Sequence, residues 1–66
     1  MKVIVNGEER EVPGDTTIER LLETGGVPRN GIAVAKNDRV VRRADFPTHA
    51  LEEGDRVEII RAVAGG

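Results

Sequence analysis

The 66-residue sequence has no cysteine, which excludes disulfides, zinc-thiolate sites and cysteine nucleophiles. No apolar run approaches the roughly 20 residues that a membrane-spanning helix requires. The N-terminal stretch Met1-Lys2-Val3-Ile4-Val5 is too short for a signal peptide. We therefore expect a cytoplasmic protein with no membrane partner and no side-chain thiol chemistry.

The sequence also lacks an excess of positive charge. Its formal net charge is -2, whereas binding to a nucleic-acid backbone requires a clustered basic face, so no nucleic-acid partner is expected. The composition, 38% hydrophobic and 33% charged, is typical of a globular domain. A domain of this size buries only about 60% of its unfolded surface, so we expect a modest core and no deep active-site cleft.

The beginning of the chain predicts a β-hairpin. Valines alternate with other side chains over residues 2–5, and Asn6-Gly7 separates this run from a second one at residues 8–12. Asn-Gly between two strand-like runs favours a type I′ turn, which needs positive φ at both central positions. The second run is heavily charged, so we expect it to be an edge strand.

A short helix is predicted to follow this hairpin. Residues 16–19, Thr-Thr-Ile-Glu, fit a capping box with Thr16 as the N-cap, or with Asp15 in its place. Gly25-Gly26 should end the helix after about two to three turns. Apolar residues recur at the spacing of one helix face, which we expect to pack on a sheet: Ile18, Leu21 and Leu22.

The second half of the sequence predicts three more strands, at residues 32–35, 39–41 and 56–60. The stretch before the last strand has no clean period, and we expect Phe46 and Leu51 to anchor it to the core. The first and last strands are rich in β-branched residues, as central strands are, and would pair in parallel. These features predict an α+β fold of the β-grasp (ubiquitin-like) type, a mixed sheet packed on one short helix.

The expected β-grasp domain covers residues 1–60 and leaves a tail, residues 61–66, that ends in Gly65-Gly66. Glycine has no Cβ, so this end can enter a channel too narrow for a side chain. Its only reactive group is the carboxylate of Gly66. A frayed terminus is the alternative interpretation. Against it, the tail directly follows a predicted strand, and six extended residues span roughly 20 Å, enough to place Gly66 in a partner's active site.

Five segments of the chain carry a family resemblance: Val5-Asn6-Gly7-Glu8, Thr17 with Leu21-Leu22, Ile32-Ala33-Val34-Ala35-Lys36-Asn37, Glu53-Gly54-Asp55-Arg56-Val57-Glu58-Ile59-Ile60 and Val63-Ala64-Gly65-Gly66. They resemble the ThiS family, the sulfur carrier proteins of thiamine biosynthesis, and they span essentially the whole chain. The terminal Gly-Gly is common to ubiquitin-like proteins, whereas the Gly-Asp-x-Val-Glu-Ile-Ile segment before it is more particular. One departure is Val41-Arg42-Arg43, where a proline commonly follows the valine in that family.

The resemblance implies a carrier with no enzymatic activity of its own and no bound cofactor. In this family an E1-like adenylyltransferase (ThiF type) uses ATP and magnesium to convert the terminal carboxylate to an acyl-adenylate, and sulfur from a donor enzyme displaces AMP. The resulting thiocarboxylate delivers its sulfur to thiazole synthase (ThiG type). Because the sequence has no cysteine, the Gly66 carboxylate is the group left to carry sulfur.

The same resemblance implies roles for the residues at the end of the chain. Gly66 would be the site of adenylation and thiocarboxylate formation, Gly65 would give backbone clearance in the partner's channel, and Arg61 would anchor the base of the tail by charge. Small residues would form the approach: Ala62, Val63 and Ala64. Independently of the resemblance, Ile4 and Ile60 fall out of phase with the inward residues of their strands. We expect them to form a docking patch on the outer face of the sheet.

Other interpretations remain open. The molybdopterin synthase small subunit shares the fold and the Gly-Gly tail, although those chains are usually longer and carry more aromatic residues. A ubiquitin-like modifier or a non-covalent β-grasp interaction module would also fit. An enzyme is least favoured, because the only histidine, His49, has no evident nucleophile or orienting partner. The residues Asp38, Asp45 and Asp55 lie in separate predicted turns, so no metal site is expected.

Overall fold

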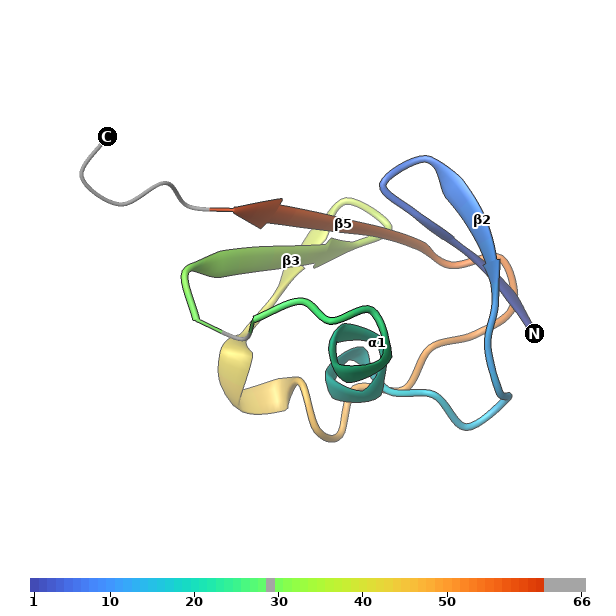
Figure 1. Ribbon diagram of the computed structural model, residues 1–66, viewed down its shortest axis with the longest axis horizontal. Helices are drawn as coiled ribbons and strands as arrows, with labels where there is room; N and C mark the ends of the chain where they lie inside the picture. Colours follow the sequence, from blue (N-terminus) through green and yellow to red (C-terminus); the bar gives the residue numbers. More distant parts are fainter. Residues whose placement is uncertain (29, 62–66) are drawn as a thin grey trace.

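The computed structural model describes residues 1–28 and 30–61, and within these ranges the chain forms one five-stranded sheet and one α-helix. The elements follow one another along the chain as β1 (Lys2–Val5), β2 (Glu8–Glu11), α1 (Ile18–Thr24), β3 (Ile32–Lys36), β4 (Arg39–Val41), the 3₁₀ helix η1 (Arg43–Asp45) and β5 (Arg56–Arg61). The strand order is β2-β1-β5-β3-β4. Figure 1 shows α1 lying against one face of this sheet. The predicted mixed sheet packed on one short helix is confirmed.

The last strand, β5, occupies the centre of the sheet. It runs parallel to β1, with Val57 opposite Val5, and antiparallel to β3, with Ile59 opposite Val34. A parallel pair needs a long crossover between its strands, and α1 lies in that crossover. The predicted parallel pairing of the first and last strands is therefore confirmed, and the strand that leads to the C-terminal tail is held between two neighbours.

Tight turns connect the two edge strands to their neighbours. Asn6 and Gly7 have φ angles of 49° and 83°, the positive values that the predicted hairpin turn needs. Asn37 and Asp38, between β3 and β4, have φ angles of 50° and 69°. Asn and Asp are the residues with a Cβ that most often adopt this left-handed region. β2 is exposed along its whole length and lies at the edge of the sheet, as predicted.

The core lies between α1 and the inward face of the sheet. Phe46 and Leu51 are 2% and 3% exposed, so the irregular connection before β5 is anchored as predicted. On β3, Val34 is buried and Ala33 is exposed, which identifies the inward face of that strand. The buried apolar side chains, including the predicted helix face, are Val3, Val5, Ile18, Leu21, Leu22, Val34, Val41, Phe46, Leu51 and Val57.

Both predicted N-caps of α1, Thr16 and the alternative Asp15, are wrong. Thr17, not Thr16, is the cap, and its Oγ1 accepts a hydrogen bond of 3.2 Å from the Arg20 backbone N–H. Thr16 is buried, and its hydroxyl donates to the Pro13 carbonyl at 2.7 Å. The reason is tertiary, because the Thr16 carbonyl accepts a hydrogen bond of 2.9 Å from the Leu51 N–H. This pairing extends the chain up to Thr17 and delays the start of the helix.

The predicted end of α1 at the two glycines is confirmed, and it takes the form of a Schellman motif. Gly26 has a φ of 69°, and its N–H donates to the Glu23 carbonyl at 3.2 Å. The Val27 N–H donates to the Leu22 carbonyl at 2.9 Å, and Val27 packs against the core. Both hydrogen bonds satisfy carbonyls that the last turn of a helix leaves without partners.

Candidate functional site

The predicted site lies at the end of β5. Arg61 is the last residue that the structure describes, and it pairs with Ile32 of β3. The sequence assigned Arg61 to the tail, whereas in the structure it belongs to the sheet. The other predicted tail residues lie outside the described ranges: Ala62, Val63, Ala64, Gly65 and Gly66. What the structure describes is therefore the root of the tail.

The side chain of Asn6 supports β5 where β1 ends. β1 stops at Val5, so no further residue of that strand pairs with the Ile59 backbone. Asn6 Oδ1 accepts a hydrogen bond of 2.8 Å from the Ile59 N–H, and Asn6 Nδ2 donates to the Ile59 carbonyl at 3.4 Å. A primary amide can replace a strand neighbour because it carries both a donor and an acceptor. β5 is thus held on both sides close to Arg61.

Sequence reasoning missed this second role of Asn6 and assigned the residue only to the hairpin turn. Asp-Gly or Gly-Gly would serve such a turn equally well. Only asparagine, however, offers a donor and an acceptor together on a side chain of this length. The sequence signal for this role was therefore an asparagine that directly follows the first strand, because the first strand was expected to pair with the last strand.

Asp55 fixes the opposite end of β5. Its buried carboxylate accepts hydrogen bonds from Asn37 Nδ2 at 2.9 Å and from the Glu52 N–H at 2.7 Å, and it lies 3.6 Å from Lys36 Nζ. Burial by itself raises the pKa of this carboxyl. The hydrogen bonds and the Lys36 charge outweigh burial, so the pKa lies below its ordinary value of 3.8. Asn37 Oδ1 also accepts from the Arg56 N–H at 2.9 Å, which ties the start of β5 to the turn after β3.

Exposed apolar side chains gather on the outer face of the sheet, the face away from α1. Ile60 is 57% exposed and lies opposite Ala33, and Val40 is 77% exposed and lies opposite Ala35. Paired residues of neighbouring strands place their side chains on the same face. We call these four residues the outer patch.

The register separates Ile4 from Ile60. Both side chains alternate away from the inward residues of their strands, as expected, but Ile4 is half-buried and lies opposite Arg56. Arg56 is the first residue of β5, whereas Ile60 is next to its last, and Glu58 lies between them on the same face. The apolar residue opposite Ile60 is therefore Ala33 of β3, and Ile4 does not lie beside Ile60.

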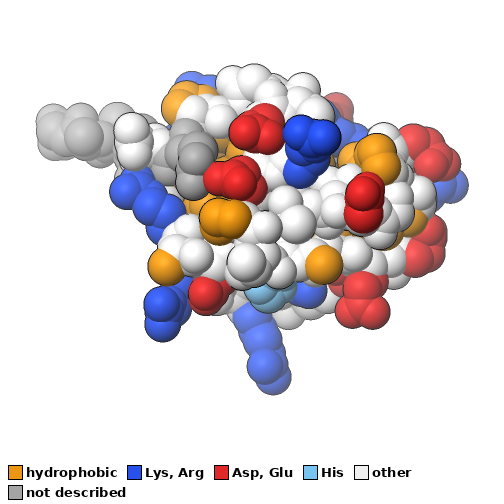
Figure 2. Space-filling view, turned by 90° about the horizontal axis from the view of Figure 1, so that it is seen from below, with side chains coloured by type: hydrophobic (Ala, Val, Ile, Leu, Met, Phe, Trp, Pro, Cys, Tyr) orange, Lys and Arg blue, Asp and Glu red, His pale blue; other side chains and the backbone are white. Residues whose placement is uncertain are grey.

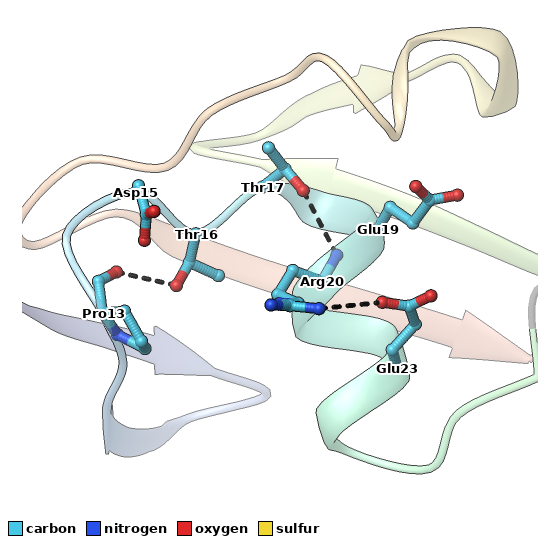
Figure 3. Close-up of a pocket in the computed structure, with 7 residues that line it drawn as sticks. All are labelled: Pro13, Asp15, Thr16, Thr17, Glu19, Arg20 and Glu23. Carbon is cyan, nitrogen blue, oxygen red and sulfur yellow. Dashed lines mark hydrogen bonds and ion pairs between the residues drawn. The ribbon is translucent and has the colours of Figure 1, made fainter.

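A polar pocket of about 280 Å³ lies at the start of α1 (Figure 3). The hydroxyls of Thr16 and Thr17 are both engaged with backbone groups, so neither is arranged as a nucleophile. Arg20 Nη1 lies 3.8 Å from Glu23 Oε1 across the same pocket. His49 is half-buried and does not line the pocket. The pocket thus shows no catalytic arrangement.

Charged side chains are frequent on the remaining surface of the described residues. No group of His, Asp and Glu within residues 1–28 and 30–61 could hold a metal ion. In the same ranges no helix is both long and apolar enough to cross a membrane. Figure 2 views the molecule from the side of α1, and acidic side chains gather at the end that carries β2. Apolar side chains on that face form only small separate spots.

Comparison with known proteins connects this geometry to one family. Residues 3–66 match the model of the ThiS family. The chain is 36% identical to the sulfur carrier protein ThiS of Thermus thermophilus over 64 residues, which are 97% of this chain and 98% of that protein. It is 27% identical to the sulfur carrier protein ThiS of Escherichia coli over the whole of both chains.

Two longer relatives and a solved structure extend the comparison. The chain is 36% identical over its full length to the thiazole synthase of Paramagnetospirillum magneticum and 35% identical to that of Magnetococcus marinus, but it spans only 20% of each of these proteins. The crystal structure of the thiamine biosynthesis protein ThiS of Geobacter metallireducens matches with a TM-score of 0.86 at 28% identity, with both chains fully covered. The resemblance seen in the sequence motifs is confirmed, and the chain belongs to the ThiS family.

Proposed function

We propose that this protein is a sulfur carrier of thiamine biosynthesis and that Gly66 carries the sulfur as a thiocarboxylate. The observation that carries this proposal is the nearly full-length match to two proteins named sulfur carrier protein ThiS. The fold supports it, because the central strand β5 leads directly into the tail. The protein is a co-substrate of cytoplasmic partner enzymes in this proposal, and it binds no cofactor itself.

The carboxylate of Gly66 needs activation because its charge is shared between two oxygens and oxide is a poor leaving group. An E1-like adenylyltransferase of the ThiF type joins this carboxylate to AMP, using ATP and magnesium, and pyrophosphate is released. A sulfur donor enzyme then supplies the sulfur that displaces AMP, and AMP leaves with one former carboxylate oxygen. The sulfur of the thiocarboxylate is more nucleophilic than the oxygen that it replaces.

The root of the tail at Arg61 limits how far away a partner enzyme can be. Gly66 is five residues beyond Arg61, so a fully extended tail places its carboxylate no more than roughly 17 Å from the end of the sheet. An enzyme that acts on Gly66 must therefore bring its channel close to Arg61. Such a channel can be narrow, because the residues that enter it add little side-chain volume: Ala62, Val63, Ala64 and Gly65.

The proposed acceptor of the sulfur is a thiazole synthase of the ThiG type. Support comes from the two relatives named thiazole synthase, each of which contains a segment similar to this whole chain. A carrier and its acceptor act in sequence, so a segment of this kind within a thiazole synthase is expected if the two cooperate. The molybdopterin synthase small subunit is the less favoured alternative, because the relatives matched over nearly their full length are named ThiS.

Intact mass spectrometry tests the proposal. The protein is measured before and after incubation with ATP, magnesium, a sulfur donor and the E1-like enzyme from the same cell. We expect a mass gain that matches replacement of one oxygen by sulfur, located at Gly66 and lost when thiazole synthase and its substrates are added. Attachment of the chain to lysines would instead identify a modifier, and transfer of the sulfur to a molybdopterin precursor would identify the synthase subunit.

A further inference from the structure

A second pocket, which we call the root pocket, opens beside the root of the tail. It lies between the inward face of the sheet and the end of α1 and has a volume of about 180 Å³. Its lining is mixed: Leu21, Val27 and Ile59 contribute apolar side chains, and Arg10 of β2 and Arg61 of β5 contribute exposed guanidinium groups. A side chain at Gly25 would have its Cβ 3.9 Å from Arg10 Nη1, so the Arg10 guanidinium reaches the end of α1.

The two guanidinium groups lack strong partners within the described residues. No acidic side chain lines the root pocket, and the Asn6 amide is occupied by the Ile59 backbone. Arg10 Nη2 lies 3.8 Å from Glu8 Oε1, but both side chains are largely exposed, and such pairs contribute little. Arg61 forms no ion pair within residues 1–28 and 30–61. Two positive charges therefore line the root pocket of a chain whose net charge is -2.

The size and chemistry of the root pocket define what it can bind. Pockets for small metabolites usually measure about 300 to 1,000 Å³, so this one is better matched to a single side chain of a protein partner. The apolar part of the lining favours an apolar side chain, and the guanidinium groups favour carboxylates, which they bind through two parallel hydrogen bonds. The complementary ligand is therefore an acidic segment that presents an apolar side chain.

The position of the root pocket indicates which protein supplies this segment. Arg61 lines the pocket and is also where the tail begins, so an enzyme that takes up Gly66 must bring the mouth of its channel close to the pocket. We propose that the root pocket binds an acidic, apolar-tipped segment at the channel mouth of the activating enzyme. This inference rests on the proposed function, in which the activating enzyme is the first to take the tail. Opposite charge also speeds the encounter of two free proteins.

The test measures the affinity of the full-length protein for the E1-like enzyme from the same cell, without ATP, at low and high salt. Arg10→Glu should raise the Kd by about tenfold or more, and the affinity of this variant should depend less on salt than that of the wild type. Arg10→Gln should have a smaller effect in the same direction. The matched control is Arg39→Glu on β4, at the other edge of the sheet, and it should change the Kd by less than about twofold.

Three results would overturn the root pocket as the binding site. These are an Arg10→Glu Kd within about twofold of wild type, an equal effect of Arg39→Glu, and no binding of the wild type. Circular dichroism and thermal unfolding of each variant show whether the fold is kept. If Arg10→Glu does not fold, Arg10→Gln takes its place in the affinity comparison.

Failure of the proposed function gives a different result. In that case the enzyme does not adenylate wild-type Gly66 when ATP and magnesium are added, whereas the binding comparison needs neither.

Discussion

At the scale of single residues, Gly26 is required for its backbone conformation and not for space. Its φ is 69°, yet nothing lies within 4 Å of the position that a Cβ would take. An L-residue in this left-handed region costs about 1 to 2 kcal/mol. We therefore expect Gly26→Ala to lower the free energy of unfolding by about 1 kcal/mol, measured by urea denaturation.

Gly14→Ala is the matched control for this prediction. A Cβ at Gly14 would also meet open space, but Gly14 does not have a positive φ. Alanine there should leave the stability unchanged or raise it slightly, because it restricts the unfolded chain. Equal losses in the two variants would show that the end of α1 does not depend on the left-handed conformation.

Asp55 should make the stability depend on pH in the acid range. Its pKa is lower in the folded protein than its ordinary value of 3.8, so the folded state binds the proton less tightly than the unfolded chain does. The stability that this carboxylate contributes is therefore fully present above the ordinary pKa and is lost as the pH falls through the folded pKa. The structural cause is the set of hydrogen bonds from Asn37 and Glu52, together with the Lys36 charge.

Asp55→Asn tests this dependence. The amide nitrogen of the variant would face a donor, either Asn37 Nδ2 or the Glu52 N–H, so the variant should be less stable than wild type near neutral pH. The difference should shrink as the pH falls below the ordinary pKa of 3.8, in urea denaturation over a pH series. Asp15→Asn, which makes the same change at an exposed position, is the matched control. A difference that stays constant with pH would contradict the assignment.

At the scale of elements, β5 places different side chains on the two faces of the sheet. Val57 packs in the core, whereas Ile60 is 57% exposed and joins Val40 in the outer patch. Ala33 and Ala35 of β3 lie between them on the same face, and a contiguous exposed apolar patch often marks a docking surface. We expect Ile60→Asp and Val40→Asp each to weaken binding to the activating enzyme by about tenfold, measured by titration.

The fold should survive both substitutions because neither side chain belongs to the buried core. Ala44→Asp adds the same charge at an exposed position of η1, outside the outer patch, and should bind as wild type does. Unchanged affinity of Ile60→Asp and Val40→Asp would remove the outer patch from the interface. It would leave the root pocket, on the other face of the sheet, to be judged by Arg10 alone.

At the scale of the whole molecule, the folded domain and the reactive end are expected to respond independently to mutation. Gly66→Ala should unfold at the same urea concentration as wild type, because the buried core lies entirely between Val3 and Val57. Its adenylation should slow by about tenfold or more. The added methyl group would clash with the wall of the narrow channel and misplace the carboxylate. Pyrophosphate release and intact mass measure the reaction. Ala64→Gly is the control, and its adenylation rate should match that of the wild type. A normal rate for Gly66→Ala would mean that no narrow channel selects the terminal glycine.

The sequence by itself determined the features that depend on neighbouring residues. Asn6-Gly7 specified a turn with positive φ, and Gly26 specified the end of α1, because few other residues adopt a positive φ. The spacing of Ile18, Leu21 and Leu22 identified the buried helix face for the same local reason. The motifs along the chain also sufficed to identify the ThiS family.

Only the tertiary structure decided the features that join distant parts of the chain. Leu51 holds Thr16 extended and moves the cap of α1 to Thr17, and Asn6 bonds to Ile59 although more than fifty residues separate them. The register of β5 places Ile60 opposite Ala33 of β3, and it places Ile4 opposite Arg56 at the other end of the strand. The root pocket likewise needs Arg10 and Arg61 together. Sequence patterns report the period of each strand, whereas contacts between strands depend on register and on packing across the core.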